Sequence, residues 1–234
     1  VFTSDDWAIV KNETEYAEAW VEPTGIGGTA YASPDSRFIG RYPGFNGNGI
    51  RVSMCDSTPG MFSNSETGVT ATCTAGLRTA TISIAATVAV GDLIDFAFAS
   101  DAPTGTYKIT KVDGTTITVD KPFNASATTK TINRFWEFYN TFDVAPLTSD
   151  FARDRSVAND EIHIAVSDAD GRISGQKGAV LETYPFVSKL YDAVNEDGSA
   201  NYYKQVIQDQ SNYIFVASHP ASGDLTATGS AWGS

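Results

Sequence analysis

The residue pattern in the middle of the chain limits its fold to a few architectures. From about Ser57 to Pro146, small polar and apolar residues alternate in short runs separated by turns, and threonine is abundant in these runs. Alternation with a period of two predicts β-strands that bury one face, and threonine suits half-exposed strand positions. A series of about five short strands joined by tight turns predicts a small all-β barrel or sandwich.

The strongest local signal in this block is the pair Asp113-Gly114, which separates the alternating runs 107–112 and 115–119. A two-residue type I′ turn needs positive φ at both central positions, and Asp-Gly is a favoured pair for it. The sequence therefore predicts a β-hairpin with a type I′ turn at 113–114. Further strands of this block are expected at 79–84, 93–98 and 131–138.

The segments on either side of this block mix helix and strand patterns. Asn12 and Ser199 are each placed to cap a helix, and the second helix would carry Tyr203, Val206 and Ile207 on one stripe. Alternating runs predict strands in both flanks, at 49–56, 161–167, 179–184 and 212–217.

Neither flank alone holds enough strands and helices to bury a core. We therefore expect an α+β fold in which the two flanks together form a discontinuous, two-layer α/β domain, residues 1–56 plus 147–234. A small all-β barrel or sandwich domain, residues 57–146, is expected to be inserted between its halves.

The charge balance excludes several classes of partner. The formal net charge is −12 and the sequence pI is about 4.4, whereas a nucleic-acid binder needs a basic surface. The chain has no run of Lys and Arg for an anionic membrane surface, and no stretch of about 20 apolar residues for a membrane span. The two cysteines, Cys55 and Cys73, are expected to be free thiols.

Two glycine-containing segments resemble ligand loops but fail in detail. The segment Asp168–Gly171 resembles the start of a calcium loop, but the twelfth position is Ala179, which cannot ligate a metal. A connecting turn is the better interpretation. The glycines of 44–49 precede a strand, whereas a phosphate loop follows a strand and opens a helix. Neither segment predicts a cofactor site.

The titratable residues also fail to form a catalytic set. His163 alternates out of phase with Ile162 and Ile164 and is expected to face solvent or an interface, and His219 ends a strand. Asp160 and Glu161 are adjacent, so on a strand they point to opposite faces and are expected to form an acidic strand edge. We expect no catalytic, metal-binding or cofactor-binding residues, no cofactor and no enzymatic activity.

Two phrases in the flanks carry a resemblance to a known family. The first is Arg41-Tyr42-Pro43-Gly44 followed by 47–53. The second consists of 159–164, 170–171, 180–182, 187–189, 192–193, 198–199, 201–203, 206–207 and 211–214. Together they resemble the tail sheath proteins of contractile-tailed bacteriophages, the myoviruses. The segment Thr183–Phe186 departs from the Phe-Glu-Gly phrase of that family.

The resemblance implies a structural subunit of the virion, assembled in the cytoplasm of the host bacterium. Such subunits stack as hexameric rings around the tail tube and contract to drive the tube through the host envelope. The implied partners are other copies of the chain and the tail tube, which the family contacts through a C-terminal domain; no nucleic acid or membrane is implied. The chain would be a middle, protease-resistant fragment, monomeric because it lacks the terminal arms.

Three other interpretations are open at this point. An enzyme such as a glycan hydrolase would need a carboxylate pair. A carbohydrate-binding or host-surface-binding module would use aromatic residues of the middle block, such as Tyr107 and Trp136, although alternation makes both equally good core residues. A sheath of a related contractile injection machine, such as a type VI secretion system or a bacteriocin, would share the fold.

Overall fold

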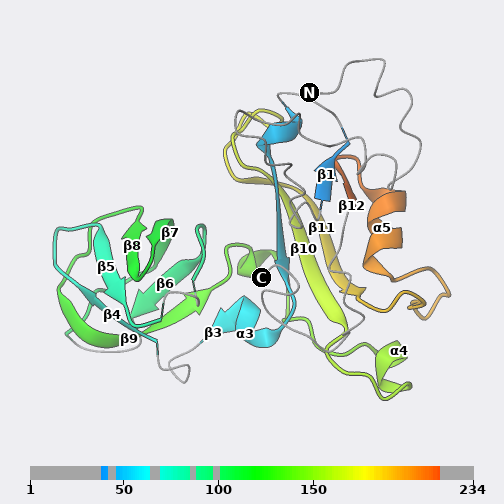
Figure 1. Cartoon of the computed structure of the whole chain (residues 1–234), viewed down its shortest axis with the longest axis horizontal. Helices are drawn as coiled ribbons and strands as arrows, with labels where there is room; N and C mark the ends of the chain where they lie inside the picture. The colour runs from blue at the N-terminus through cyan, green and yellow to red at the C-terminus, as the bar shows by residue number, and fades with distance from the viewer. Residues whose placement is uncertain (1–37, 42–45, 64–68, 85–87, 97–100, 217–234) are drawn as a thin grey trace, which may run out of the picture. The chain divides into compact units, whose positions relative to one another are not determined.

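A computed structural model describes residues 38–41, 46–63, 69–84, 88–96 and 101–216. The chain divides into two compact units, one made of the residues up to Asp56 and from Pro146 onward, the other of Ser57–Ala145 (Figure 1). These units are called the flanking domain and the barrel domain below. The expected second boundary, between 146 and 147, lies one residue from this one. The helix expected after Asn12, and His219, lie outside the described residues.

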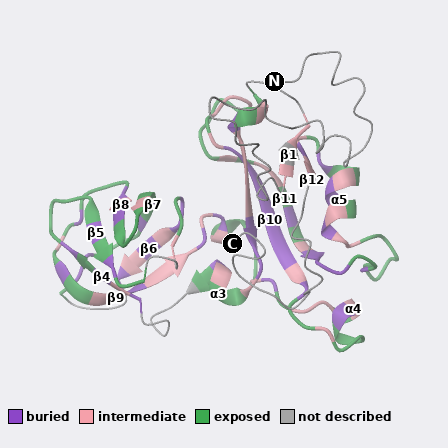
Figure 2. Cartoon of the chain, viewed as in Figure 1, coloured by how far each residue is buried: buried purple, intermediate pink, exposed green. Residues whose placement is uncertain are grey.

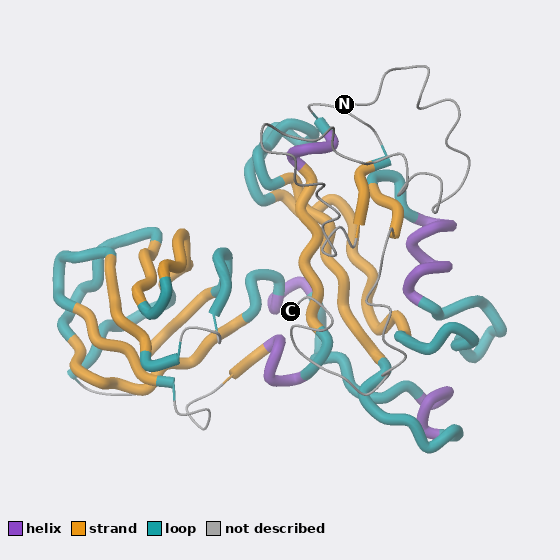
Figure 3. The backbone as a smooth tube through the Cα atoms, in the orientation of Figure 1, coloured by secondary structure: helices purple, strands orange, loops and turns teal. Residues whose placement is uncertain are grey.

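The barrel domain is built around a closed ring of six antiparallel strands (Figure 3). Their order is β9-β4-β5-β8-β7-β6, and β6 pairs back with β9. The strands are β4 (Thr70–Cys73), β5 (Thr79–Ile82), β6 (Leu93–Phe96), β7 (Tyr107–Asp113), β8 (Thr116–Val119) and β9 (Ala127–Phe135). The expectation of an inserted all-β barrel or sandwich is confirmed, as a barrel.

Short elements flank the ring in the sequence. Helix α3 (Thr58–Met61) leads into β3 (Phe62–Ser63), which pairs with β9 outside the closed ring, and a 3-10 turn, η4 (Tyr139–Thr141), follows β9. The N-cap of α3 is Ser57, whose hydroxyl accepts the N–H of Gly60. This cap satisfies one of the amides that the start of a helix leaves without a partner.

Alternation along the strands fills the interior of the barrel. In β5 and β8 the apolar residues Ala80, Ile82, Ile117 and Val119 are buried, while the intervening threonines are exposed or half-exposed. Ile94, Tyr107, Ile109 and Ile132 of the other strands join this core, as does Phe123 from the connection between β8 and β9. The period-two pattern therefore identified the core of this domain correctly.

The hairpin of β7 and β8 is confirmed, but the predicted turn type is wrong. Asp113 pairs with Thr116, so the two central residues of the turn are Gly114 and Thr115. Only Gly114 has a positive φ, of 58°. A type I′ turn needs two such residues, whereas a type II′ turn needs one, with glycine at the first central position. Pairing through Asp113 lengthens the strand by one residue and moves the turn accordingly.

The flanking domain contains a three-stranded antiparallel sheet in the order β11-β10-β2. Its strands are β2 (Ile50–Cys55), β10 (Glu161–Asp168) and β11 (Ala179–Ser188). A second, two-stranded sheet pairs β1 (Phe38–Gly40) with β12 (Ile214–Val216). Three helical segments complete the described elements: η1 (Gly47–Gly49), α4 (Asp150–Arg153) and α5 (Tyr203–Gln210).

Helix α5 and strand β12 cover one face of the three-stranded sheet. Ile162, Ile164 and Val166 of β10 pack in one core with residues of α5 and β12, and Ile50, Val52 and Met54 of β2 join this core. The stripe Tyr203, Val206 and Ile207 is likewise buried, as its spacing predicts. Seven of the eight residues of β10 are buried, including those on the opposite face (Figure 2).

The expectation of a two-layer α/β domain is met only in part. Most of the regular secondary structure of the described residues is β, and all named strand pairs are antiparallel. The longest described helix, α5, has eight residues. Within the described ranges no helix has the length and apolar character of a membrane span. Cys55 in β2 and Cys73 in β4 are both buried, and they form no disulfide with each other, as expected.

The barrel domain occupies the connection between two paired strands. β2 ends at Cys55 and β10 begins at Glu161, yet the two strands are hydrogen-bonded neighbours, with Cys55 opposite His163. Adjacent antiparallel strands need a connection of only a few residues. The barrel domain is therefore an insertion in the sequence between β2 and β10, where a short loop would be long enough to connect the two strands.

Candidate functional site

A bulge in β11 forms the first wall of a groove in the flanking domain. Ile162 pairs with Val187 and Ile164 with Tyr184, so His163 faces two residues of β11, Pro185 and Phe186. An extra residue on one strand is the definition of a β-bulge. Phe186, one of the two residues of the bulge, has a positive φ of 53°, which is uncommon for a residue other than glycine. Such strained positions cluster at functional sites.

His163 contacts this bulge through a hydrogen bond and a ring contact. Its Nδ1 accepts the N–H of Phe186 at 3.1 Å, and the two rings meet edge to face with centroids 4.6 Å apart. The expectation that His163 faces solvent or an interface is wrong, because its side chain is fully buried. A central strand is covered on both faces, so alternation does not send every second residue to solvent.

A tight loop forms the second wall. Val194 bridges to Ala200, and within this loop Asn195 Nδ2 donates to Ser199 Oγ at 3.0 Å. The Ser199 hydroxyl and N–H both donate to Asp197, and these bonds lower the pKa of that carboxyl. Ser199 was expected to cap a helix, and this is wrong. Helix α5 begins at Tyr203, and the N-cap residue is Tyr202, which makes no side-chain capping bond.

Helix α5 forms the third wall, and its C-terminal end is fixed by Arg41. The Arg41 guanidinium donates to the carbonyls of Gln208 (2.7 Å) and Ile214 (3.1 Å) and stacks on Phe215 at 4.0 Å. A cation is favourable at this end of a helix, where carbonyls lack intrahelical partners. Arg41 is the first residue of the first phrase that resembles the sheath family. Its described contacts are with residues that belong to the second phrase or lie next to it in the sequence.

The space between these walls has a volume of about 500 Å³ and is called the β11 groove. This volume lies within the range of small-molecule sites, about 300 to 1,000 Å³. The lining residues are Thr183, Tyr184, Pro185, Phe186, Val187, Asn195, Ser199, Ala200, Asn201, Val206, Asp209 and Gln210. Sequence reasoning proposed none of them as site residues, because they come from three segments that only the fold brings together.

A second feature of the flanking domain is a buried polar cluster next to the connections of the barrel. The Asp160 carboxylate accepts the N–H and the hydroxyl of Ser149, each at 2.8 Å, and the hydroxyl of Ser188 at 2.6 Å. Asp160 is fully buried, so the expected acidic strand edge is wrong at this position. Ser149 also caps α4 by accepting the N–H of Ala152. Asp160 therefore ties the start of β10 to α4 and to the end of β11.

Lys189 completes this cluster. Its Nζ donates to the carbonyl of Asn159 at 2.9 Å, and the residue is almost fully buried. Burial lowers the pKa of Lys189, while the nearby carboxylates of Asp56 and Asp160 oppose that shift. Asp56, itself buried, is the last residue of the flanking domain before the barrel begins. The linker cluster is defined as Asp56, Ser149, Asn159, Asp160, Ser188 and Lys189.

The Asp168 segment is a connecting turn, as predicted. The Asp168 carboxylate accepts the N–H groups of Arg172, Ile173 and Ser174 and the hydroxyl of Ser174, at 2.7–2.9 Å. Burial alone would raise the pKa of Asp168, but these bonds outweigh it and lower the pKa to about 2. Among the described residues, no group of three or more His, Cys, Asp or Glu side chains is placed to hold a metal ion.

The two aromatic residues considered for sugar stacking, Tyr107 and Trp136, are both buried. Tyr107 is 1% exposed, and its hydroxyl bonds to Asn124 Oδ1 and to the Thr104 carbonyl. Trp136 is 5% exposed and stacks on Phe142 with centroids 5.4 Å apart. Both are therefore core residues, and neither presents a face to a ligand.

Comparison of the chain with models of protein families, with curated proteins and with solved structures finds no match.

Proposed function

We propose that this chain is part of a structural subunit of a bacteriophage contractile tail sheath. In this role the subunits stack as rings around the tail tube, and the sheath contracts to drive the tube through the host envelope. The proposal places the chain in the virion, assembled in the cytoplasm of the host. Its partners are other copies of the same protein and the tail tube. It assigns the chain no reaction and no cofactor.

The observation that best supports the proposal is the insertion of a closed barrel between the paired strands β2 and β10. The sheath resemblance implies an α/β domain interrupted by a more peripheral β-barrel domain. The described architecture agrees with the interruption and with the barrel. The described part of the flanking domain is richer in β-structure than that expectation.

The residues that carry the resemblance hold the flanking domain together. Arg41 binds the carbonyls of Gln208 and Ile214, and Asp160 binds Ser188. These contacts join segments that lie far apart in the sequence, which is the role of residues that fix a rigid body. A sheath that contracts exchanges contacts between rigid domains, because packed interfaces have discrete arrangements.

Electron microscopy of the protein expressed from its complete reading frame tests this proposal. Hollow tubes built of stacked rings are the expected result, and antibodies against residues 57–145 are expected to decorate the tail shaft of the corresponding phage. Antibodies that label the capsid or the tail tip, or none of the particle, would contradict the proposal. The 234-residue chain by itself is expected to be a 25.0 kDa monomer in light scattering.

Comparison of extended and contracted particles sharpens the test. Contacts between whole domains are expected to change, while the strand pairings inside the barrel and inside the β11-β10-β2 sheet stay the same. Rearranged pairing within either sheet would contradict the mechanism while leaving the assignment to a sheath intact.

A further inference from the structure

We infer that the β11 groove is a binding site for a neutral oligosaccharide. The site is separate from the proposed assembly function, and nothing in that function requires it. The charge, the backbone and the side chains of the groove lining together favour this class of ligand.

The first consideration is charge. Among the twelve lining residues the only ionisable groups are the carboxyl of Asp209 and the phenol of Tyr184, so the lining contains no cation. Asp197, in the loop that forms one wall, adds a further carboxylate whose pKa is lowered by its bonds to Ser199. An anionic ligand such as a phosphate would need paired cations, usually Arg or Lys. Anionic ligands are therefore disfavoured.

The second consideration is the backbone of β11, which is the edge strand of the described sheet. A peptide that added a strand here would need the free N–H and C=O groups of that edge. Pro185 has no N–H, the N–H of Phe186 is bonded inward to His163, and its carbonyl accepts Asn201 Nδ2 at 3.0 Å. Proline and bulges are devices that block strand addition. A peptide strand is therefore a poor fit.

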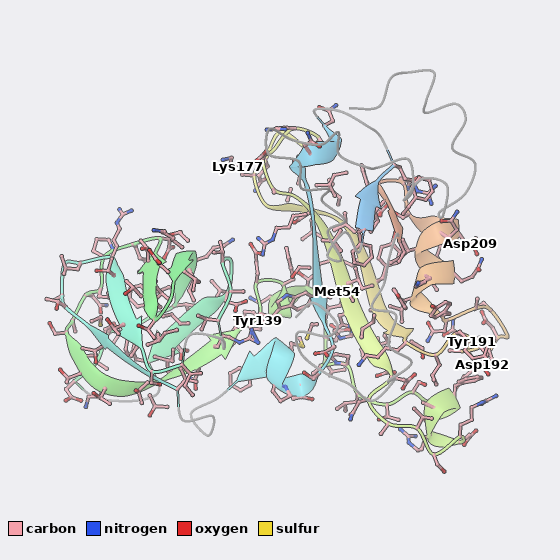
Figure 4. The ribbon with its side chains drawn as sticks, in the orientation of Figure 1. Met54, Tyr139, Lys177, Tyr191, Asp192 and Asp209 are labelled. Atoms are coloured by element: carbon pink, nitrogen blue, oxygen red, sulfur yellow. The ribbon has the colours of Figure 1, made fainter. Side chains whose placement is uncertain are left out.

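The third consideration is the polar side chains that remain. Asp209 and Gln210 are exposed on α5, where Figure 4 labels Asp209, and Gln205 Nε2 holds the Asp209 carboxylate at 2.7 Å. Asn195 and Ser199 are fixed to each other across the loop. Carboxylate, amide and hydroxyl groups together both donate and accept hydrogen bonds. This mixture suits a ligand that carries many hydroxyl groups.

The fourth consideration is the apolar part of the lining. The half-exposed ring of Phe186 is held by the bulge and by its edge-to-face contact with His163, and Pro185 beside it is exposed. A fixed ring beside a few oriented polar groups is the usual composition of a small-molecule site. The C–H face of a sugar ring can pack on this platform while its hydroxyl groups reach Asp209 and Gln210.

The experiment uses the 234-residue chain and a panel of oligosaccharides of two to four units. Neutral gluco-, galacto-, manno- and N-acetylglucosamine oligomers are compared with sialylated and sulfated ones, first on a glycan array and then by calorimetry. At least one neutral oligomer is expected to bind with a dissociation constant of about 1 mM or tighter. In a ¹H–¹⁵N spectrum its addition is expected to shift the amides of Asn195, Ser199, Asp209 and Gln210.

Two variants of exposed residues distinguish this site from any other. Asp209→Ala removes a charged hydrogen-bonding group from the lining and is expected to weaken binding about tenfold. Asp192→Ala removes an exposed carboxylate outside the lining and is expected to leave binding unchanged (Figure 4). Equal losses in both variants would overturn the inference.

Two other results would also overturn it. One is that only anionic glycans bind, and the other is that no neutral oligomer binds while a basic peptide shifts the same amides. Because ring assembly is measured separately by electron microscopy, failure of sugar binding leaves the sheath proposal standing. Equally, failure of assembly leaves this inference standing.

Discussion

The two domains of this chain solve the problem of buried polar groups in different ways. The barrel closes its sheet on itself, so its strands have paired neighbours and their side chains alternate between core and surface. The flanking domain instead buries its central strand on both faces and buries polar side chains such as Asp160, His163 and Lys189. Among the described residues the barrel buries one charged side chain, Asp92, which is paired with Arg134. The barrel therefore depends mainly on apolar packing, whereas the flanking domain depends on several buried polar side chains and their partners.

The largest effect is expected in the linker cluster. Asp160→Ala leaves the hydroxyls of Ser149 and Ser188 without their acceptor and removes a carboxylate near the buried Lys189 ammonium. Loss of one partner from a buried charged group costs about 3 to 5 kcal/mol. The expected result is a decrease of this size in the free energy of unfolding of the flanking domain, measured by denaturant titration.

Asp154→Ala is the matched control, since Asp154 is an exposed carboxylate of the same domain. It is expected to change the free energy of unfolding by less than about 0.5 kcal/mol. If Asp160→Ala lowers the free energy of unfolding by less than about 1 kcal/mol, the buried polar contacts of the linker cluster do not stabilise the flanking domain as proposed.

In the barrel the corresponding test is a cavity. Ile117 is fully buried in the core of this domain, and Ile117→Ala is expected to cost about 2 to 5 kcal/mol. Hydrogen exchange should show faster exchange of amides in β5, β7 and β8, with amides of β10 unchanged. Thr116→Ala, at an exposed neighbouring position, serves as the control. Equal acceleration in β10 would show that the two domains unfold as one unit.

Two glycines with positive φ, one in each domain, allow a comparison of the domains in which smaller losses of stability are expected. At Gly171 (φ 75°) an added Cβ would lie 3.0 Å from the Lys177 backbone nitrogen, whereas at Gly114 (φ 58°) it would meet nothing within 4 Å. Gly171→Ala therefore combines backbone strain with a contact, and about 1 to 3 kcal/mol is expected. Gly114→Ala carries strain alone, about 1 kcal/mol. Thermal unfolding of both variants checks the order, and a larger loss at Gly114 would reverse it.

Acid titration compares one carboxylate from each domain. The pKa of Asp168 is lowered to about 2, so its contribution to stability is present above its ordinary value near 3.8 and is lost as pH falls toward 2. The stability difference between the wild type and Asp168→Asn is therefore expected to shrink over this range. Unfolding free energies at a series of pH values measure it.

Asp95 in the barrel is expected to show the opposite slope. Burial raises the pKa of Asp95, against the lowering effect of its bond with Asn133, so protonation is easier in the folded state. Relative to Asp95→Asn, the wild type should gain stability as pH falls through the raised pKa. Parallel slopes for Asp95 and Asp168 would contradict either the burial described for Asp95 or the hydrogen bonding described for Asp168.

The sequence predicted well wherever local periodicity decides the structure. Spacing along a single segment predicted five of the six strands of the ring, though not β4. The same kind of pattern predicted the inward face of Ile162, Ile164 and Val166 and the buried stripe of α5. Local periodicity therefore predicts faces and most strands. The sequence predicted poorly at turns and caps. The hairpin turn moved by one residue, and Ser199 lies in a loop because its hydroxyl has a nearer partner in Asp197.

The residue pattern alone predicts the organisation: an inserted all-β domain, either a barrel or a sandwich, and the apolar positions of the sheet and of α5. The pairing of β6 with β9 shows that the inserted domain is a barrel. Only the tertiary structure decided the fate of the polar residues. His163 is buried because Phe186, 23 positions away, forms a bulge over it, and Asp160 is buried because Ser188, 28 positions away, supplies a hydroxyl. The β11 groove likewise joins three segments. Periodicity reports which face of an element is buried, but the partner of a buried polar group comes from elsewhere in the chain, and spacing carries no record of it.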